Sequence, residues 1–115
     1  MDDMTLITDN RSLAKACDRL SKELYLSVDT EFMREKTYYP RLCLIQISGE
    51  TEAIAIDALS PGINLGPAFQ LLNDPKIIKV FHACRQDMEI FFHLTKKTPK
   101  PVFDTQIAAM VCGYG

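Results

Sequence analysis

ELYLSVDTEF, residues 23–32, alternates between two kinds of side chain. Because successive side chains of a β-strand point to opposite faces of a sheet, this period of two predicts a strand. One face would carry Leu24, Leu26, Val28, Thr30 and Phe32, and the other Tyr25, Ser27, Asp29 and Glu31. The largely apolar first face indicates that the strand belongs to the sheet interior.

Asp29 and Glu31 are two residues apart, so the predicted strand presents two carboxylates side by side on one face. Like charges that close repel and raise each other's proton affinity unless a cation neutralises them. Hard divalent cations that prefer oxygen ligands, Mg²⁺ or Mn²⁺, are the natural partners. An exposed acidic pair on an edge strand is the competing interpretation, and for the pair taken alone it is the better one. The interior position of the strand favours the metal site.

A third carboxylate, Asp87, interrupts an apolar stripe on the helix predicted after His82. The stripe follows helical spacing through Ala83, Ile90, Phe91 and Leu94. A charged group on that stripe would be costly without a partner. Two interpretations stay open from the periodicity. Asp87 is either solvated or paired with a nearby Arg or Lys at the stripe's edge, or it reaches across to metal ions held by Asp29 and Glu31.

The remaining patterns predict the element order of an α/β fold. Leu13, Ala16, Cys17, Leu20 and Leu24 recur at helical spacing after Thr8-Asp9-Asn10, any of which could cap a helix. Then follow the strand 23–32, hairpin strands Leu42–Ser48 and Glu52–Asp57, a short helix Ala68–Leu72, a strand Ile77–His82, a helix Ala83–Leu94, a strand Val102–Asp104 and a helix from Thr105.

Strands joined by a hairpin should pair antiparallel, whereas strands joined through helices should add in parallel. The order therefore predicts a mixed β-sheet flanked by helices, which matches a ribonuclease-H-like layout, although other mixed α/β folds fit it equally well. The near-continuous apolar run Ile77–His82 predicts a strand that is covered on both faces.

Composition limits the class of protein. The 115 residues of the chain (1–115) are enough for one domain with one hydrophobic core. The formal net charge of −2 argues against a protein that holds nucleic acid by bulk electrostatics. The four cysteines include no close pair, so neither a zinc site nor a redox motif is indicated, and they are typical of reduced core residues. The acidic N-terminus and the lack of a long apolar run predict a cytoplasmic protein without a membrane span.

Three segments together resemble the ribonuclease D family of the DEDD exonucleases, in the subgroup that uses a tyrosine. Asp29-Thr30-Glu31-Phe32, running on to Thr37-Tyr38-Tyr39-Pro40 and Leu42–Ile47, resembles the first exonuclease motif. His82-Ala83 followed by Gln86-Asp87-Met88-Glu89 resembles the second, and Phe103-Asp104-Thr105-Gln106 the strand-to-helix segment beyond it. The similarity covers nearly the whole chain.

The resemblance implies that Asp29, Glu31 and Asp87 correspond to three of the four metal-binding carboxylates of the family. It also implies hydrolysis of RNA from its single-stranded 3′ end to nucleoside monophosphates, with two Mg²⁺ or Mn²⁺ ions about 3.5–4 Å apart around the scissile phosphate. The RNA could be a transfer-RNA precursor or another RNA, and the sequence does not predict an oligomeric state.

One feature departs from the family pattern. The family's last motif contains a tyrosine followed four residues later by an aspartate, and this sequence stops at Gly113-Tyr114-Gly115 before any such pair. Asp104 is a poor substitute, because a helix cap is the commoner role at its position. The expectation is a C-terminally truncated exonuclease domain with weak or no activity. A non-catalytic RNA-binding or regulatory module of the same fold, and an unrelated mixed α/β protein with surface acids, are the alternatives.

Overall fold

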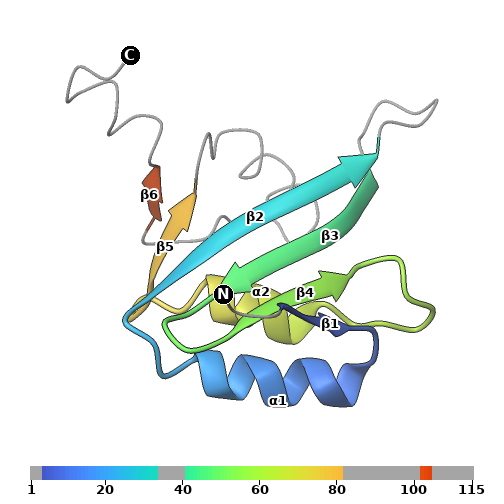
Figure 1. Ribbon diagram of the computed structural model, residues 1–115, viewed down its shortest axis with the longest axis horizontal. Helices are drawn as coiled ribbons and strands as arrows, with labels where there is room; N and C mark the ends of the chain where they lie inside the picture. Colours follow the sequence, from blue (N-terminus) through green and yellow to red (C-terminus); the bar gives the residue numbers. More distant parts are fainter. Residues whose placement is uncertain (1–3, 34–40, 82–101, 105–115) are drawn as a thin grey trace.

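The computed structural model describes residues 4–33, 41–81 and 102–104, and of Met33 and residues 102–104 it describes the backbone (Figure 1). Its elements are β1 Met4–Ile7, α1 Asn10–Leu20, β2 Tyr25–Met33, β3 Arg41–Ser48, β4 Ala53–Asp57, α2 Gly66–Leu72, β5 Ile78–Phe81 and β6 Val102–Asp104. The predicted helices Ala83–Leu94 and from Thr105 onward lie outside the described residues. Among the elements described, no helix is long and apolar enough to cross a membrane.

The strands form one six-stranded sheet in the order β1-β4-β3-β2-β5-β6. β2 pairs antiparallel with β3, and β3 with β4, whereas β5 adds parallel to β2 and β6 parallel to β5. The predicted mixed sheet and its pairing directions are confirmed, and β2 lies in the sheet interior. The sequence did not predict β1, which pairs parallel with β4 at one edge. Four residues are too few for a period of two to be recognised.

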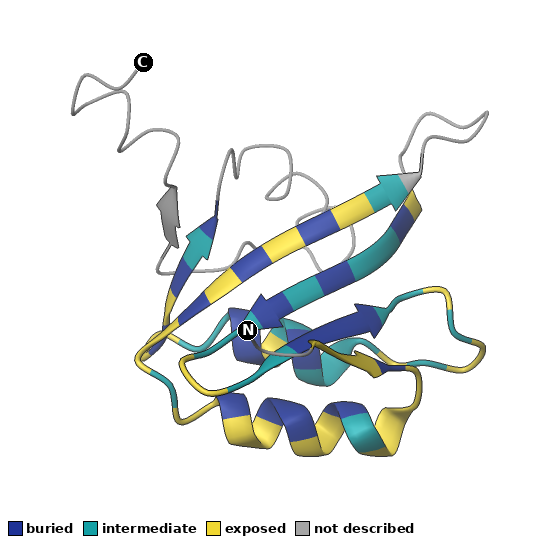
Figure 2. Ribbon diagram, in the orientation of Figure 1, coloured by how far each residue is buried: buried dark blue, intermediate teal, exposed yellow. Residues whose placement is uncertain are grey.

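The alternation predicted for β2 is confirmed. Leu26, Val28 and Thr30 are buried, while the residues between them are exposed (Figure 2). The buried side of the sheet and both helices share one hydrophobic core. Its members include Leu13, Ala16 and Leu20 of α1, Leu26 and Val28 of β2, Ile45 and Ile47 of β3, Ile54 and Ile56 of β4, and Ala68, Leu71 and Leu72 of α2. We call this side the helix face.

Leu24 was expected to lie on that buried face, and this prediction is wrong. β2 begins one residue later, at Tyr25, and α1 ends at Leu20. Leu24 therefore belongs to the connection between them, where its side chain is 81% exposed.

The expectation that β5 is covered on both faces is also wrong, because Ile78 is 48% exposed while the next residue, Lys79, is fully buried on the helix face. The Lys79 ammonium Nζ donates a hydrogen bond of 2.6 Å to the carbonyl oxygen of Asp74. Burial lowers the pKa of Lys79, and the charge of Asp74 partly opposes that shift. A buried ammonium is tolerated when it is hydrogen-bonded and its aliphatic stem packs among apolar side chains.

α1 begins at a side-chain cap. Asp9 accepts a hydrogen bond of 2.8 Å from the backbone N–H of Ser12 and one of 2.9 Å from its hydroxyl. These bonds lower the pKa of Asp9. They also satisfy a donor that the first helical turn would otherwise leave free. The capping residue is therefore Asp9, one of the three predicted from the sequence.

Cys17 of α1 is buried, and burial raises the pKa of its thiol from 9.0 to about 11. Because the unfolded chain loses this proton first, the thiol stabilises the fold below pH 9 and that contribution declines as pH rises toward 11. We predict that the unfolding free energy of the wild type, relative to Cys17→Ala, is about 2 kcal/mol smaller at pH 10.5 than at pH 8. Urea unfolding of both proteins at the two pH values measures this, and a pH-independent difference would contradict it.

Candidate metal centre on β2

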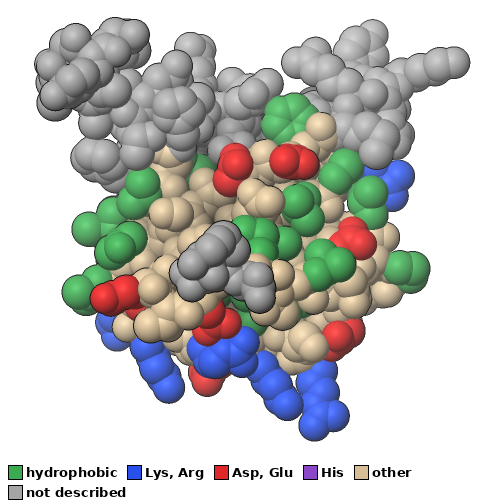
Figure 3. Space-filling model, viewed as in Figure 1, with side chains coloured by type: hydrophobic (Ala, Val, Ile, Leu, Met, Phe, Trp, Pro, Cys, Tyr) green, Lys and Arg blue, Asp and Glu red, His purple; other side chains and the backbone are tan. Residues whose placement is uncertain are grey.

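Asp29 and Glu31 both lie exposed on β2, on the side of the sheet opposite the helices. We call this side the carboxylate face. It carries Tyr25, Ser27, Asp29 and Glu31 of β2 together with their partners on the neighbouring strands. Figure 3 shows this face, on which acidic and hydrophobic side chains are interspersed. In a regular strand, which rises by about 3.3 Å per residue, side chains two residues apart leave the backbone roughly 7 Å apart on the same face.

The strand register identifies the neighbours of the two carboxylates. Asp29 lies opposite Gln46 of β3, and Glu31 lies opposite Leu44. Directly opposed residues have Cβ atoms about 4.5–5.5 Å apart, so the amide of Gln46 is within reach of Asp29. Gln46 was not among the site residues predicted from the sequence. The available signal was its position as the one polar side chain in the run Leu42–Ile47.

Asp57 of β4 also belongs to the carboxylate face, since it lies opposite Leu44 on the far side of β3. Two strand spacings separate it from Glu31, or about 9–10 Å. That separation is too long for both carboxylates to bind one ion. Asp57 accepts instead a hydrogen bond of 2.9 Å from the backbone N–H of Leu59.

The carboxylates have few protein partners in the described ranges. The Oδ1 atom of Asp29 accepts a hydrogen bond of 3.0 Å from the backbone N–H of Thr30. Neither Asp29 nor Glu31 forms a salt bridge with another described residue. No group of three potential metal-binding side chains is present there either. Asp87, the third carboxylate that the resemblance implies, lies outside the described residues, so the structure brings together two of the three.

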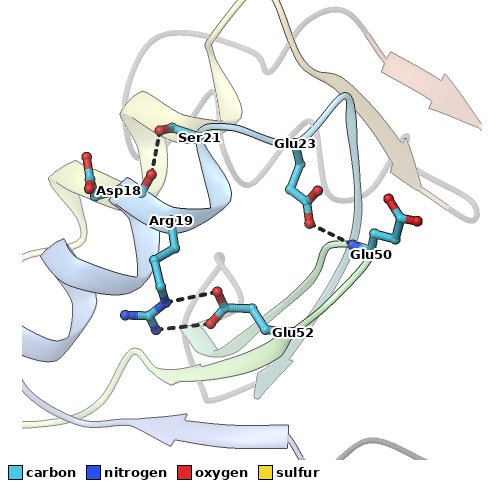
Figure 4. A network of polar contacts seen from close by, with 6 residues as sticks. All are labelled: Asp18, Arg19, Ser21, Glu23, Glu50 and Glu52. Carbon is cyan, nitrogen blue, oxygen red and sulfur yellow. Dashed lines mark hydrogen bonds and ion pairs between the residues drawn. The ribbon is translucent and has the colours of Figure 1, made fainter.

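The turn between β3 and β4 is held by an ion pair to α1 and by a hydrogen bond to the segment after α1 (Figure 4). The guanidinium of Arg19 donates two hydrogen bonds, of 2.9 and 3.0 Å, to the carboxylate of Glu52. The carboxylate of Glu23 accepts a hydrogen bond of 2.7 Å from the backbone N–H of Glu50. A Cβ atom at position 49 would overlap that carboxylate, so a side chain there would displace Glu23 from its present position. These contacts tie the turn between β3 and β4 to α1 and to the segment that follows α1.

The sequence resembles known proteins over nearly its whole length. A family model described as 3′–5′ exonuclease matches residues 4–115. Ribonuclease D of Gluconacetobacter diazotrophicus is 51% identical over 113 residues, which are 98% of this chain and 29% of the relative. Ribonuclease D of Sphingobium indicum is 55% identical over 111 residues, again 29% of its length. The chain thus spans under a third of the length of these relatives.

Solved structures share the fold of this chain. The ribonuclease D of Escherichia coli, an exoribonuclease involved in structured RNA processing, matches with a TM-score of 0.89 and 37% identity. The match covers 96% of this chain and 29% of that one. The catalytic core of RRP6 from Trypanosoma brucei matches with a TM-score of 0.87 and 27% identity, over 96% of this chain and 31% of that one. The ribonuclease-D-like α/β fold is therefore confirmed, and the chain belongs to the 3′–5′ exonuclease family.

Proposed function

We propose that this chain forms part of a metal-dependent exoribonuclease site that hydrolyses RNA from its 3′ end to nucleoside monophosphates. One observation carries the proposal. Asp29 and Glu31 stand side by side on an interior strand, exposed, with no salt bridge to a described cation. Two like charges in that position are expected to bind a cation, and membership of the 3′–5′ exonuclease family supplies the matching chemistry.

The donor set fits a hard divalent cation. Carboxylate oxygens are the ligands that Mg²⁺ and Mn²⁺ prefer, and we propose Asp29, Glu31 and Asp87 as the three that this chain contributes. When bound, a pair of such ions activates a water molecule and stabilises the leaving 3′ oxygen. The chain's carboxylates hold the ions in place. Their negative charge also keeps the phosphate away unless metal is present, which makes binding of the RNA end metal-dependent.

The substrate we propose is RNA with a single-stranded 3′ end, with transfer-RNA precursors as one class. Support comes from the Escherichia coli relative, which is an exoribonuclease involved in structured RNA processing. Further support is the net charge of −2, because phosphate recognition through metal ions needs no basic groove. We also propose that residues 1–115 belong to one domain in the cytoplasm, consistent with a single sheet and the free thiols of Cys17 and Cys43.

The test uses the full-length protein and two labels on one single-stranded RNA. With Mg²⁺ or Mn²⁺, a 3′ label should leave at once as a nucleoside monophosphate, while a 5′ label should mark products that shorten one nucleotide at a time. EDTA should stop both. RNA binding that is indifferent to EDTA, without release of nucleotides, would instead support the non-catalytic module.

A further inference from the structure

β3 contains an irregularity beside the candidate metal centre. Glu31 pairs with Leu44, but the next residue of β2, Phe32, pairs with Leu42. Cys43 is therefore an extra residue in β3, and the two strands form a β-bulge at the step from Glu31 to Phe32. Asp29, in contrast, lies in the regular part of the ladder, opposite Gln46. The irregularity therefore lies beside Glu31 and not beside Asp29.

The bulge is held from its other side by Ala58, the residue that follows β4. The carbonyl of Cys43 accepts a hydrogen bond of 3.0 Å from the backbone N–H of Ala58. Ala58 occupies the second position of a turn closed by the hydrogen bond of 3.2 Å from Ser60 N–H to the carbonyl of Asp57. Cys43 is thus unpaired toward β2 but paired toward β4, and the extra residue has a fixed place in the sheet.

The core explains why this register persists. Leu42 is buried, and its partner Phe32 packs against the same hydrophobic core. In a ladder without the bulge, Cys43 would take the place of Leu42 opposite Phe32, and the two residues of β3 that precede Cys43, Leu42 and Arg41, would change face. The apolar pattern of the strand end therefore selects the bulged register.

We propose that the bulge at Cys43 is a positioning device that turns Glu31 relative to Asp29, so that both carboxylates serve one pair of metal ions. A bulge bends its strand and increases the local right-handed twist, and bulges are frequent beside active sites for this reason. A regular strand would keep the two side chains parallel and roughly 7 Å apart, whereas paired ions in such sites are about 3.5–4 Å apart. The inference rests on the proposed function, because it concerns the same carboxylates.

Deleting Cys43 tests the inference sharply. The deletion leaves the pairs Glu31–Leu44 and Phe32–Leu42 in place with all core side chains on their present faces, but the ladder becomes regular. In the full-length protein we expect the dissociation constant for Mn²⁺, measured by calorimetry without RNA, to rise about 10–100-fold, as for other supports of metal ligands. Cys43→Ala and Cys43→Ser keep the extra residue and should bind Mn²⁺ within about threefold of the wild type. This control separates the bulge from the thiol.

Ala58→Pro is a second, milder variant for the case that the deletion prevents folding. Proline is favoured at the second position of such a turn, so the substitution removes the N–H that holds the Cys43 carbonyl and little else. We expect Mn²⁺ binding to weaken about 3–10-fold, by analogy with other outer supports of metal ligands. Ala58→Ser, which retains the N–H, should leave it unchanged.

The outcomes separate the two proposals. Mn²⁺ binding that is unaffected by Asp29→Asn would overturn the proposed function. Binding that is lost in Asp29→Asn but unaffected by Ala58→Pro and by a folded deletion variant would overturn the role of the bulge alone.

Discussion

Asp29→Asn should abolish metal-dependent release of nucleotides, with a fall in the single-turnover rate of about 10²–10⁴-fold, the equivalent of several kcal/mol of transition-state stabilisation. The variant keeps the size of the side chain and its hydrogen bond from the Thr30 N–H, so the strand itself should be unaffected. What disappears is one negative charge at the proposed cation site. Glu31→Gln and Asp87→Asn should act in the same direction.

Asp57→Asn is the matched control. Asp57 lies on the same face of the same sheet, but Leu44 stands between it and Glu31. The amide oxygen can still accept the hydrogen bond from Leu59. We therefore expect a rate within about threefold of the wild type, as for surface substitutions away from a site. Equal rates for the wild type and Asp29→Asn, with Mn²⁺ binding intact, would remove the carboxylate pair from the mechanism.

The part of the fold that could be predicted is the part where side-chain periodicity and burial coincide. The alternation over residues 23–32 predicted β2, its buried side and the common direction of Asp29 and Glu31, because one side of that strand packs on helices. The antiparallel hairpin and the parallel addition of β5 and β6 followed from whether a turn or a helix joins the strands. Periodicity could not reveal β1, whose four residues are too short a run.

Other features depend on contacts between distant residues, which a single sequence does not display. Lys79 lies in the middle of an apolar run, and the apolar pattern does not show the hydrogen bond from its ammonium to the carbonyl of Asp74. Ile78 is apolar but exposed. Its exposure could not be predicted, because hydrophobicity alone does not say which face of a sheet is covered. For the candidate metal centre, the sequence pattern predicted the shared face of Asp29 and Glu31, whereas the partner Gln46 and the extra residue Cys43 follow from the register of β2 against β3.

Ile45→Ala should produce the largest loss of stability among the conservative truncations that we consider. Ile45 is fully buried at the middle of β3, with Thr30 on one side and Ile56 on the other. Removing its outer carbons leaves a cavity between the sheet and the helices, and such truncations cost about 2–5 kcal/mol. Against a total stability of about 5–15 kcal/mol for a typical domain, that is a large fraction. Urea unfolding should show a lower midpoint with an unchanged slope.

A graded series distinguishes packing from damage to the site. Ile45→Val removes one methyl group and should cost about 0.5–1.5 kcal/mol, while the exposed Lys15→Ala on α1 should stay within about 0.5 kcal/mol of the wild type. Because Ile45 points into the core and Asp29 points to the opposite face, the folded fraction of Ile45→Ala should bind Mn²⁺ with the wild-type affinity. A weaker affinity in that fraction would mean that the core sets the carboxylate geometry through the backbone of β3. The stability of the sheet and the positions of the carboxylates would then depend on the same core packing.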